Sequence, residues 1–149
     1  MRRLTLCCFV AVLLSTTLCF AFEEPKQDAA FSEGVAGGVI DTVRNGLVGH
    51  NPEVMLSAFD RDKMAGYNQF ADQLRAFFDQ YESFRVYARV TQTAVENGRG
   101  IAMVEFQLEE TPRDPAVPPI RMTGQLRLVM ERGGKGWKLV DFSPRNFFS

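Results

Sequence analysis

The chain has 149 residues, of which 46% are hydrophobic, and it carries 17 basic and 18 acidic side chains. This length is too short for two ordinary domains and is sufficient for one hydrophobic core. The nearly balanced charge provides neither the basic field that nucleic acid requires nor an acidic tail for a cationic partner, so we expect no nucleic-acid partner.

The N-terminus has the pattern of an export signal. Met1-Arg2-Arg3 is basic, Leu4–Phe20 is uncharged and mostly apolar, and the small residue Ala21 follows before an acidic stretch. These are the n-region, h-region and cleavage-site features of a secretory signal peptide. We therefore predict a signal peptide over residues 1–21, cleavage near Ala21, and an exported protein, periplasmic or secreted, with no membrane association after cleavage.

Two alternatives for this segment stay open. The apolar run could be an uncleaved membrane anchor, although it is slightly shorter than the ~20 residues that a spanning helix needs. It could also lead a lipoprotein lipidated on Cys19, although Leu18 is bulkier than the small residue usual there. The other cysteines, Cys7 and Cys8, also lie in this segment. A cleaved chain would therefore have no disulfide and no thiolate zinc site.

Residues 22–149 are predicted to form a single domain that begins with helices. Three early glycines, Gly34, Gly37 and Gly38, weaken helix propensity, and we interpret them as points where the helix backbone approaches a sheet closely. The first helix, from Ala29 to Gly49, is indicated by apolar residues that recur every four positions: Phe31, Val35, Val39, Val43 and Leu47.

Two more helices are predicted before the chain changes its period. A short helix is expected at Pro52–Phe59, since Asn51 is a preferred N-cap and proline is tolerated at the first helical position. A third helix follows a polar break at Asp60–Lys63. Its apolar stripe, which we interpret as a packing face rather than a cofactor site, consists of Met64, Tyr67, Phe70, Ala71, Leu74, Phe77, Phe78 and Tyr81.

From Phe84 the apolar period becomes two, which predicts a pair of strands joined by a hairpin near Asn97-Gly98. A two-residue loop would mix the apolar and polar faces, whereas a three-residue loop over Glu96–Gly98, with Gly98 left-handed, keeps them apart. We therefore predict the three-residue loop. The cross-strand pairs expected from it are Val90 with Val104, Ala88 with Phe106, Arg89 with Glu105, and Arg85 with Glu109.

The last part of the chain predicts a second hairpin. Thr111–Pro119 contains four prolines and is expected to be a connector rather than a strand. Two strands follow, Arg121–Arg132 and Trp137–Ser143, joined by a glycine-rich turn at Gly133–Gly136. Three helices followed by four sequential antiparallel strands define an α+β fold, with the helices on one face of a meander.

The order of these elements resembles the nuclear transport factor 2-like (NTF2-like) superfamily. The similarity includes Phe77–Tyr81, which leads into the first long strand, and the final strand Gly136–Ser143, with the sequence Gly-Trp-Lys-Leu-Val-Asp-Phe-Ser. The resemblance implies a curved meander, a cystatin-like roll, that wraps around the three N-terminal helices as a cone with an apolar pocket. The superfamily includes ketosteroid isomerases, polyketide cyclases, dehydratases and many non-enzymatic binding or dimerising domains, so the fold does not select a function.

Few residues offer catalytic chemistry. The only histidine, His50, lies in a turn between two helices, where we expect a surface or capping role. Isomerase-type relatives need a carboxylate base in an apolar pocket, and Asp141 is the best candidate, with Tyr67 or Tyr81 supplying a hydroxyl. The alternative is that Asp141 caps a strand end or faces solvent and that the tyrosines pack. Gln92 either faces the mouth of the cone or marks where its strand leaves the core. We assign no catalytic, ligand-binding or metal-ligating residue and expect no cofactor.

These observations predict an exported, non-catalytic binding or interaction domain. Its apolar cone either holds a small hydrophobic ligand or is filled, and Phe147-Phe148 either tucks under the sheet or meets a partner. We predict a homodimer that forms through the mixed charges on the outer sheet face; the alternative is that this face is solvated. The alternative function is a small-molecule isomerase, dehydratase or cyclase that uses a pocket carboxylate. A buried carboxylate in an open pocket would favour the enzyme, whereas a pocket plugged by Phe70, Phe77 and Phe106 would favour the interaction module.

Overall fold

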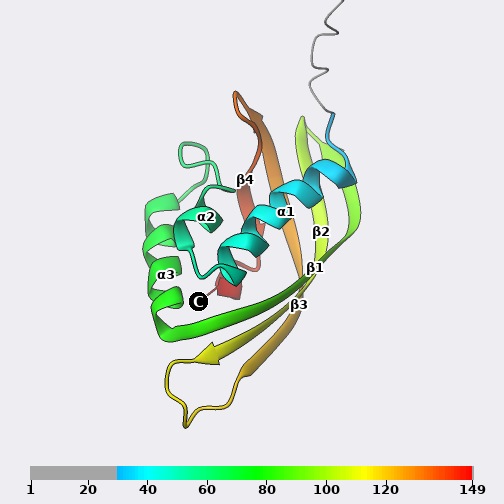
Figure 1. Ribbon diagram of the computed structural model, residues 1–149. Helices are drawn as coiled ribbons and strands as arrows, with labels where there is room; N and C mark the ends of the chain where they lie inside the picture. The colour runs from blue at the N-terminus through cyan, green and yellow to red at the C-terminus, as the bar shows by residue number, and fades with distance from the viewer. Residues whose placement is uncertain (1–29, 149) are drawn as a thin grey trace, which may run out of the picture.

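Three helices pack against one face of a four-stranded antiparallel sheet in the computed structural model, which describes residues 30–148 (Figure 1). The strands follow one another in the order β1-β2-β3-β4, which confirms the predicted α+β meander. The predicted signal peptide, residues 1–21, lies outside the described residues. The elements are α1 (Glu33–Val48), α2 (Pro52–Leu56), α3 (Tyr67–Gln80), β1 (Tyr81–Glu96), β2 (Arg99–Pro112), β3 (Ile120–Gly133), β4 (Gly136–Ser143) and a 3-10 helix, η1 (Arg145–Phe148).

Local interactions set the helix ends. The Asn51 side chain accepts hydrogen bonds from the backbone amides of Glu53 and Val54, as expected for the N-cap of α2. This helix ends at Leu56, earlier than predicted, because the next segment joins the edge of β4. The Leu139 amide donates to the Ala58 carbonyl at 2.9 Å, and the Asp60 amide donates to the Leu139 carbonyl at 2.8 Å. The segment therefore covers the outer edge of the sheet.

The close helix contact is made by a glycine other than the three that the sequence suggested. A methyl group on Gly37 or Gly38 would meet nothing within 4 Å, and one on Gly34 would meet only a side chain at 3.9 Å. A methyl group on Gly46 would instead overlap the backbone nitrogen of Met55 in α2. The interpretation of the early glycines was therefore wrong, and the contact that requires a glycine joins α1 to α2 rather than to the sheet.

The loop of the β1–β2 hairpin differs from the predicted one, but the predicted cross-strand pairs form. Glu96 pairs directly with Arg99, so the loop has two residues, Asn97 and Gly98, both with positive φ. Val90 nevertheless pairs with Val104, and the other three predicted pairs also form. The extra residue that restores alternation is Thr91, in a bulge within β1 rather than in the loop.

The sheet curls around the helices, with its concave face covered by them (Figure 1). Apolar side chains of β2, β3 and β4 line this concave face and form one core with α1, α2 and α3. The strand β2 continues to Pro112, two residues into the predicted connector, because Thr111 and Pro112 pair with the start of β1. The loop between β2 and β3 then extends away from the helices (Figure 1).

The Gly46 contact gives a test of this packing. We expect Gly46→Ala to lower the free energy of unfolding by about 3 kcal/mol, because the added methyl group overlaps rigid backbone. Gly37→Ala in the same helix is the matched control, and we expect it to raise stability by about 0.5–1 kcal/mol through helix propensity alone. Urea unfolding followed by circular dichroism measures both changes. Equal effects of the two substitutions would contradict the close contact.

Candidate functional site

The interior of the cone is filled by aromatic side chains. Phe147 and Phe148 of η1 are 9% and 5% exposed, so these two residues tuck under the sheet. The Phe148 ring centroid lies 5.9 Å from both Phe106 of β2 and Phe142 of β4. Phe142 in turn contacts Phe70 of α3 at 5.3 Å. Aromatic contacts therefore run without interruption from α3 across the interior to β2.

These contacts leave almost no free volume. The residual cavity measures about 10 Å³. A cavity of that size holds one water at most, whereas pockets for small molecules usually measure about 300–1,000 Å³. Its walls are entirely apolar: Ile40, Val43, Phe59, Phe106, Leu126, Leu128, Leu139, Phe142 and Phe148. Phe70, Phe77 and Phe106 are all buried, as the sequence analysis required for a plugged pocket, and Phe147 and Phe148 complete the plug.

Among residues 30–148, one carboxyl group lies inside the fold, and it belongs to Glu110 of β2. This side chain is 2% exposed, and its Oε1 atom has no hydrogen-bond partner. Burial raises the pKa of Glu110 above its usual value, and a hydrogen bond from Tyr81 offsets part of that rise. Burial likewise raises the pKa of the Tyr81 hydroxyl, and its bond to Glu110 adds to the effect. The buried carboxyl and the half-buried phenol thus form a polar pair.

His50 packs beside this pair but serves a structural role. Its Nε2–H donates to the Tyr81 carbonyl oxygen, with the two heavy atoms 2.9 Å apart. Its ring centroid lies 5.7 Å from Phe84 in a stacked arrangement and 5.4 Å from Phe78 edge-on. The half-buried imidazole therefore fastens the α1–α2 turn to the junction of α3 and β1, where the sequence suggested a surface or capping role.

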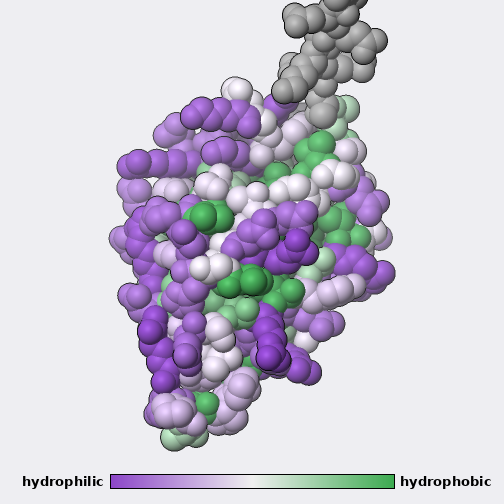
Figure 2. All heavy atoms as spheres, viewed as in Figure 1, coloured by the Kyte–Doolittle hydropathy of each residue, from purple (hydrophilic) through white to green (hydrophobic). Residues whose placement is uncertain are grey.

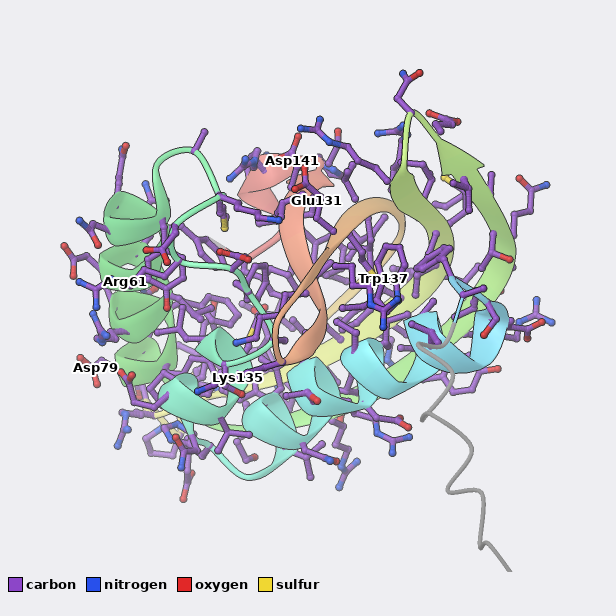
Figure 3. The ribbon with its side chains drawn as sticks, turned by 90° about the horizontal axis from the view of Figure 1, so that it is seen from above. Arg61, Asp79, Glu131, Lys135, Trp137 and Asp141 are labelled. Atoms are coloured by element: carbon purple, nitrogen blue, oxygen red, sulfur yellow. The ribbon has the colours of Figure 1, made fainter. Side chains whose placement is uncertain are left out.

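Asp141 lies on the outer side of the sheet, away from the cone. Figure 3 shows it together with Glu131 on the side away from α1. Its carboxylate is half exposed and bonds Arg145 at 2.5 Å. The reason is a bulge at Val140: Leu139 pairs with Met130 facing inward, but the extra residue turns Asp141 outward. The solvent-facing alternative for Asp141 is the one that the structure supports.

The remaining candidate residues are separated in space. Gln92 pairs with Met103 on the outer face and is exposed, because the Thr91 bulge turns it away from the cone. Tyr67 and Tyr81 lie at opposite ends of α3, about 20 Å apart at the helical rise of 1.5 Å per residue. The structure thus unites Tyr81 with Glu110 and leaves Tyr67, Gln92 and Asp141 outside that group.

The outer face of the sheet carries ordered charge pairs. Arg89 bonds Glu105 at 2.8 Å, and Arg127 bonds Glu96 at 3.1 Å. Glu109 accepts from Arg121 at 2.6 Å, and this bond lowers the pKa of Glu109 below its usual value. Exposed pairs of this kind each contribute about 0.2–1 kcal/mol, so their main effect is to pattern the surface.

Surface hollows are larger than the interior cavity. A groove of about 450 Å³ lies between the α2–α3 segment and the β3–β4 turn. Its lining includes cations and anions in equal number, Arg61, Lys135 and Lys138 against Glu53, Asp60 and Asp62. On the face drawn in Figure 2, apolar residues form small separate groups among hydrophilic ones. That face therefore carries no broad apolar patch, and specific recognition there would have to use hollows.

Neither a metal site nor a membrane helix is found in residues 30–148. No group of three or more His, Cys, Asp or Glu side chains in that range could hold a metal ion. No helix in the same range has the length and apolar character needed to cross a bilayer.

Helices wrapped by a curved four-stranded meander define an NTF2-like fold. No protein-family model matches the sequence, and no curated protein does either. Among solved structures, an NTF2-like superfamily protein from Salmonella enterica has a TM-score of 0.65 at 13% identity, over 74% of this chain and 87% of that one. This neighbour carries the NTF2-like description that the order of elements suggested, and the expected fold is confirmed.

Two further neighbours show how varied the descriptions within this fold are. A conserved protein from Planctomyces limnophilus has a TM-score of 0.64 at 15% identity, over 74% of this chain and 91% of that one. A ketosteroid isomerase-like protein from Erwinia carotovora atroseptica has a TM-score of 0.59 at 11% identity, over 75% and 95% of the two chains. At these identities the likeness establishes the fold and leaves the function to be argued from the site.

The buried carboxyl was missed although the sequence contained its signal. Ala102, Val104, Phe106 and Leu108 alternate on the inward face of β2, and continuing that alternation places Glu110 inward too. The sequence analysis used only the adjacent Glu109, which pairs with Arg85 on the outer face. A charged residue in phase with a row of inward-facing apolar residues therefore indicates a buried ionisable side chain.

The pair Glu109 and Glu110 gives a test with opposite signs. A raised pKa means that folded Glu110 keeps its proton at a pH where the unfolded chain has lost it. The stability that the Glu110 carboxyl contributes is fully present below the pKa that this group has in the unfolded chain. It is lost as pH rises toward the higher pKa that the group has in the folded chain. We therefore expect Glu110→Gln to gain melting temperature relative to wild type as pH rises from about 4 to about 8.

Glu109→Gln is the matched control on the same strand. Its lowered pKa contributes stability that is present above the unfolded pKa and is lost as pH falls through the folded pKa. This variant should therefore lose melting temperature relative to wild type as pH rises through the acid range to about 5, and its difference from wild type should stay constant above that. Thermal scans at several pH values measure both differences. A pH-independent difference for Glu110→Gln would show that the carboxyl is not held in a desolvated site.

Proposed function

We propose that this chain is a non-catalytic interaction domain that acts through its outer surfaces. The observation that carries the proposal is the residual interior cavity of about 10 Å³, which leaves no room for an organic ligand. The plug is a segment of the chain, η1, and not a few side chains of the sheet or helices that could rotate away. A ligand in the cone would have to displace Phe147 and Phe148 together, along with the aromatic contacts that they make.

The partner that we propose is a second copy, bound through the outer face of the sheet. A hollow of about 420 Å³ lies there, with Ile101 and Val129 among its lining residues. These two side chains form a small buried cluster with Val140, outside the main core. Both signs of charge line the same hollow, Arg99 and Arg127 together with Glu96 and Asp141. A two-fold interface brings one patch against itself, so a patch with both signs can be self-complementary.

We also propose that the domain works outside the cytoplasm, after removal of residues 1–21. The support is the sequence pattern at the N-terminus, namely a basic start, a charge-free apolar run and a small residue before the acidic stretch. In that compartment a chain without cysteine depends on its core, and the dense aromatic packing is consistent with that requirement.

A second candidate function is a pocket enzyme of isomerase or dehydratase type. One observation favours it, namely the buried Glu110 carboxyl with its free Oε1 atom and its bond from Tyr81. A carboxyl held neutral in an apolar site can donate a hydrogen bond to a substrate oxygen. The likeness to a ketosteroid isomerase-like protein supports the fold alone. This function requires the interior to open, which ranks it second.

The closed interior is tested by removing part of the plug. We expect Phe148→Ala to lose about 3–5 kcal/mol of stability and to leave a dry apolar cavity. Benzene should then raise the melting temperature of this variant, because such cavities bind apolar molecules of that size. Benzene should leave wild type unchanged, and also Val48→Ala, whose side chain is 58% exposed. Benzene stabilisation of wild type would show that the cone is already open.

The dimer is tested by light scattering. We expect a mass of twice the chain at micromolar concentration, and Arg127→Glu should convert it to monomer by opposing the nearby Glu96. Arg44→Glu on α1 is the matched control and should stay dimeric. A monomeric wild type would rule out the outer-face dimer.

Cleavage is tested by mass spectrometry of the exported protein. An intact mass that still includes residues 1–21 would rule out cleavage.

A further inference from the structure

A third surface hollow lies outside the cone, between α1 and the β3–β4 hairpin. It measures about 310 Å³, within the range of small-molecule sites. On α1 it is bordered by positions 35, 38, 39 and 42, a helical stripe adjacent to the buried one. Its lining residues are Val35, Gly38, Val39, Thr42, Ser57, Ala58, Lys135, Trp137 and Lys138.

Gly38 keeps this hollow open. A methyl group at that position would meet no atom within 4 Å, so the helix leaves free space where most residues would place a side chain. The neighbouring Thr42 hydroxyl donates to the Gly38 carbonyl at 3.2 Å and is thus occupied by its own helix. The α1 wall of the hollow is therefore apolar, formed mainly by Val35 and Val39.

Trp137 forms the aromatic part of the lining. Its ring centroid lies 5.0 Å from that of Phe31, and Phe31 packs so closely on Gly100 that a methyl group there would overlap the ring. These contacts fix the half-buried indole in place before any ligand arrives. Figure 3 shows Trp137 on the hairpin beside α1 and Lys135 at the hairpin turn. A rigid aromatic surface of this kind offers contact area at low entropic cost.

The charge of the hollow has a single sign. Lys135 and Lys138 line it, and none of the described acidic residues does. Within residues 30–148 neither lysine makes an ion pair or a side-chain hydrogen bond, whereas Lys63 bonds Glu131 at 3.0 Å. The adjoining mixed-charge groove shares both lysines, and its three carboxylates, Glu53, Asp60 and Asp62, line that groove and not this hollow. Asp60 accepts two backbone amides and Glu53 bonds Arg75.

We propose that this hollow binds a small amphipathic monoanion, with its apolar body on Trp137 and Val39 and its carboxylate-type head at Lys135 and Lys138. Burial of the apolar body supplies most of the affinity. The ammonium groups of the exposed Lys135 and the half-buried Lys138 select the anion, and their effect weakens as salt rises. This site is independent of the proposed dimer, which uses the other face of the sheet.

The probe is octanoate, with its neutral analogue octanamide as the matched control, titrated into the full chain. Trp137 is the only tryptophan, so its fluorescence and its single indole N–H resonance both report on the hollow. We expect octanoate to shift both signals with a Kd of about 1 mM. Octanamide should bind about tenfold more weakly, and the octanoate Kd should rise with salt. Equal binding of octanamide and octanoate would overturn the proposal.

Three variants separate the hollow from other apolar surfaces. Removing both charges with Lys135→Gln and Lys138→Gln together should weaken octanoate about tenfold. Gly38→Leu should fill the hollow and abolish the signal change while leaving the fold intact by circular dichroism. Arg44→Gln, on an exposed part of α1, should bind octanoate like wild type. Unchanged binding by Gly38→Leu or by the double lysine variant would refute the site. Binding of phosphatidylglycerol vesicles without any response to octanoate would also overturn it and would assign the hollow to a lipid surface.

Discussion

The aromatic packing of η1 against the concave sheet is the interaction on which the rest of the structure depends. The Phe147 ring centroid lies 5.4 Å from that of Phe106 and 5.1 Å from that of Phe148. Gly124 of β3 makes room for the Phe147 ring, because a methyl group on Gly124 would lie only 3.2 Å from it. Each such pair adds about 0.5–1.5 kcal/mol to the area that it buries. A curved sheet around three helices would otherwise enclose a void, and this segment fills it.

Because the interior is filled, the hollows lined by charged side chains lie on the surface of the domain. The buried carboxyl of Glu110 remains as a desolvated group, hydrogen-bonded to the half-buried Tyr81. The outer face, the mixed-charge groove and the hollow beside Trp137 are the regions that combine a hollow with charged side chains. We propose that the surface rather than the cone carries the function, which is a different use of the same architecture.

Much of the fold could be predicted because helical and strand periods in this chain are strong. The apolar stripes of α1 and α3, the four strands and their order all follow from spacing, and the charge pairs of β1 and β2 follow from face alternation. The location of the bulges could not be predicted, because one extra residue costs little and leaves no compositional mark. The bulges at Thr91 and Val140 each reverse the facing of the next residues in their strand, and those reversals moved Gln92 and Asp141 out of the expected site.

The two bulges also have a consequence for how such chains diverge. Each divides its strand into two segments, and each segment keeps its own alternation of inner and outer residues. Insertion or deletion of a residue at Thr91 would exchange inner and outer positions only up to the Asn97-Gly98 turn, and the aromatic interior would keep its pattern. The same change at Val140 would turn Leu139 or Phe142 away from the interior, because one of them lies on each side of that bulge. Related chains are therefore expected to vary in length at Thr91 and to keep their length at Val140.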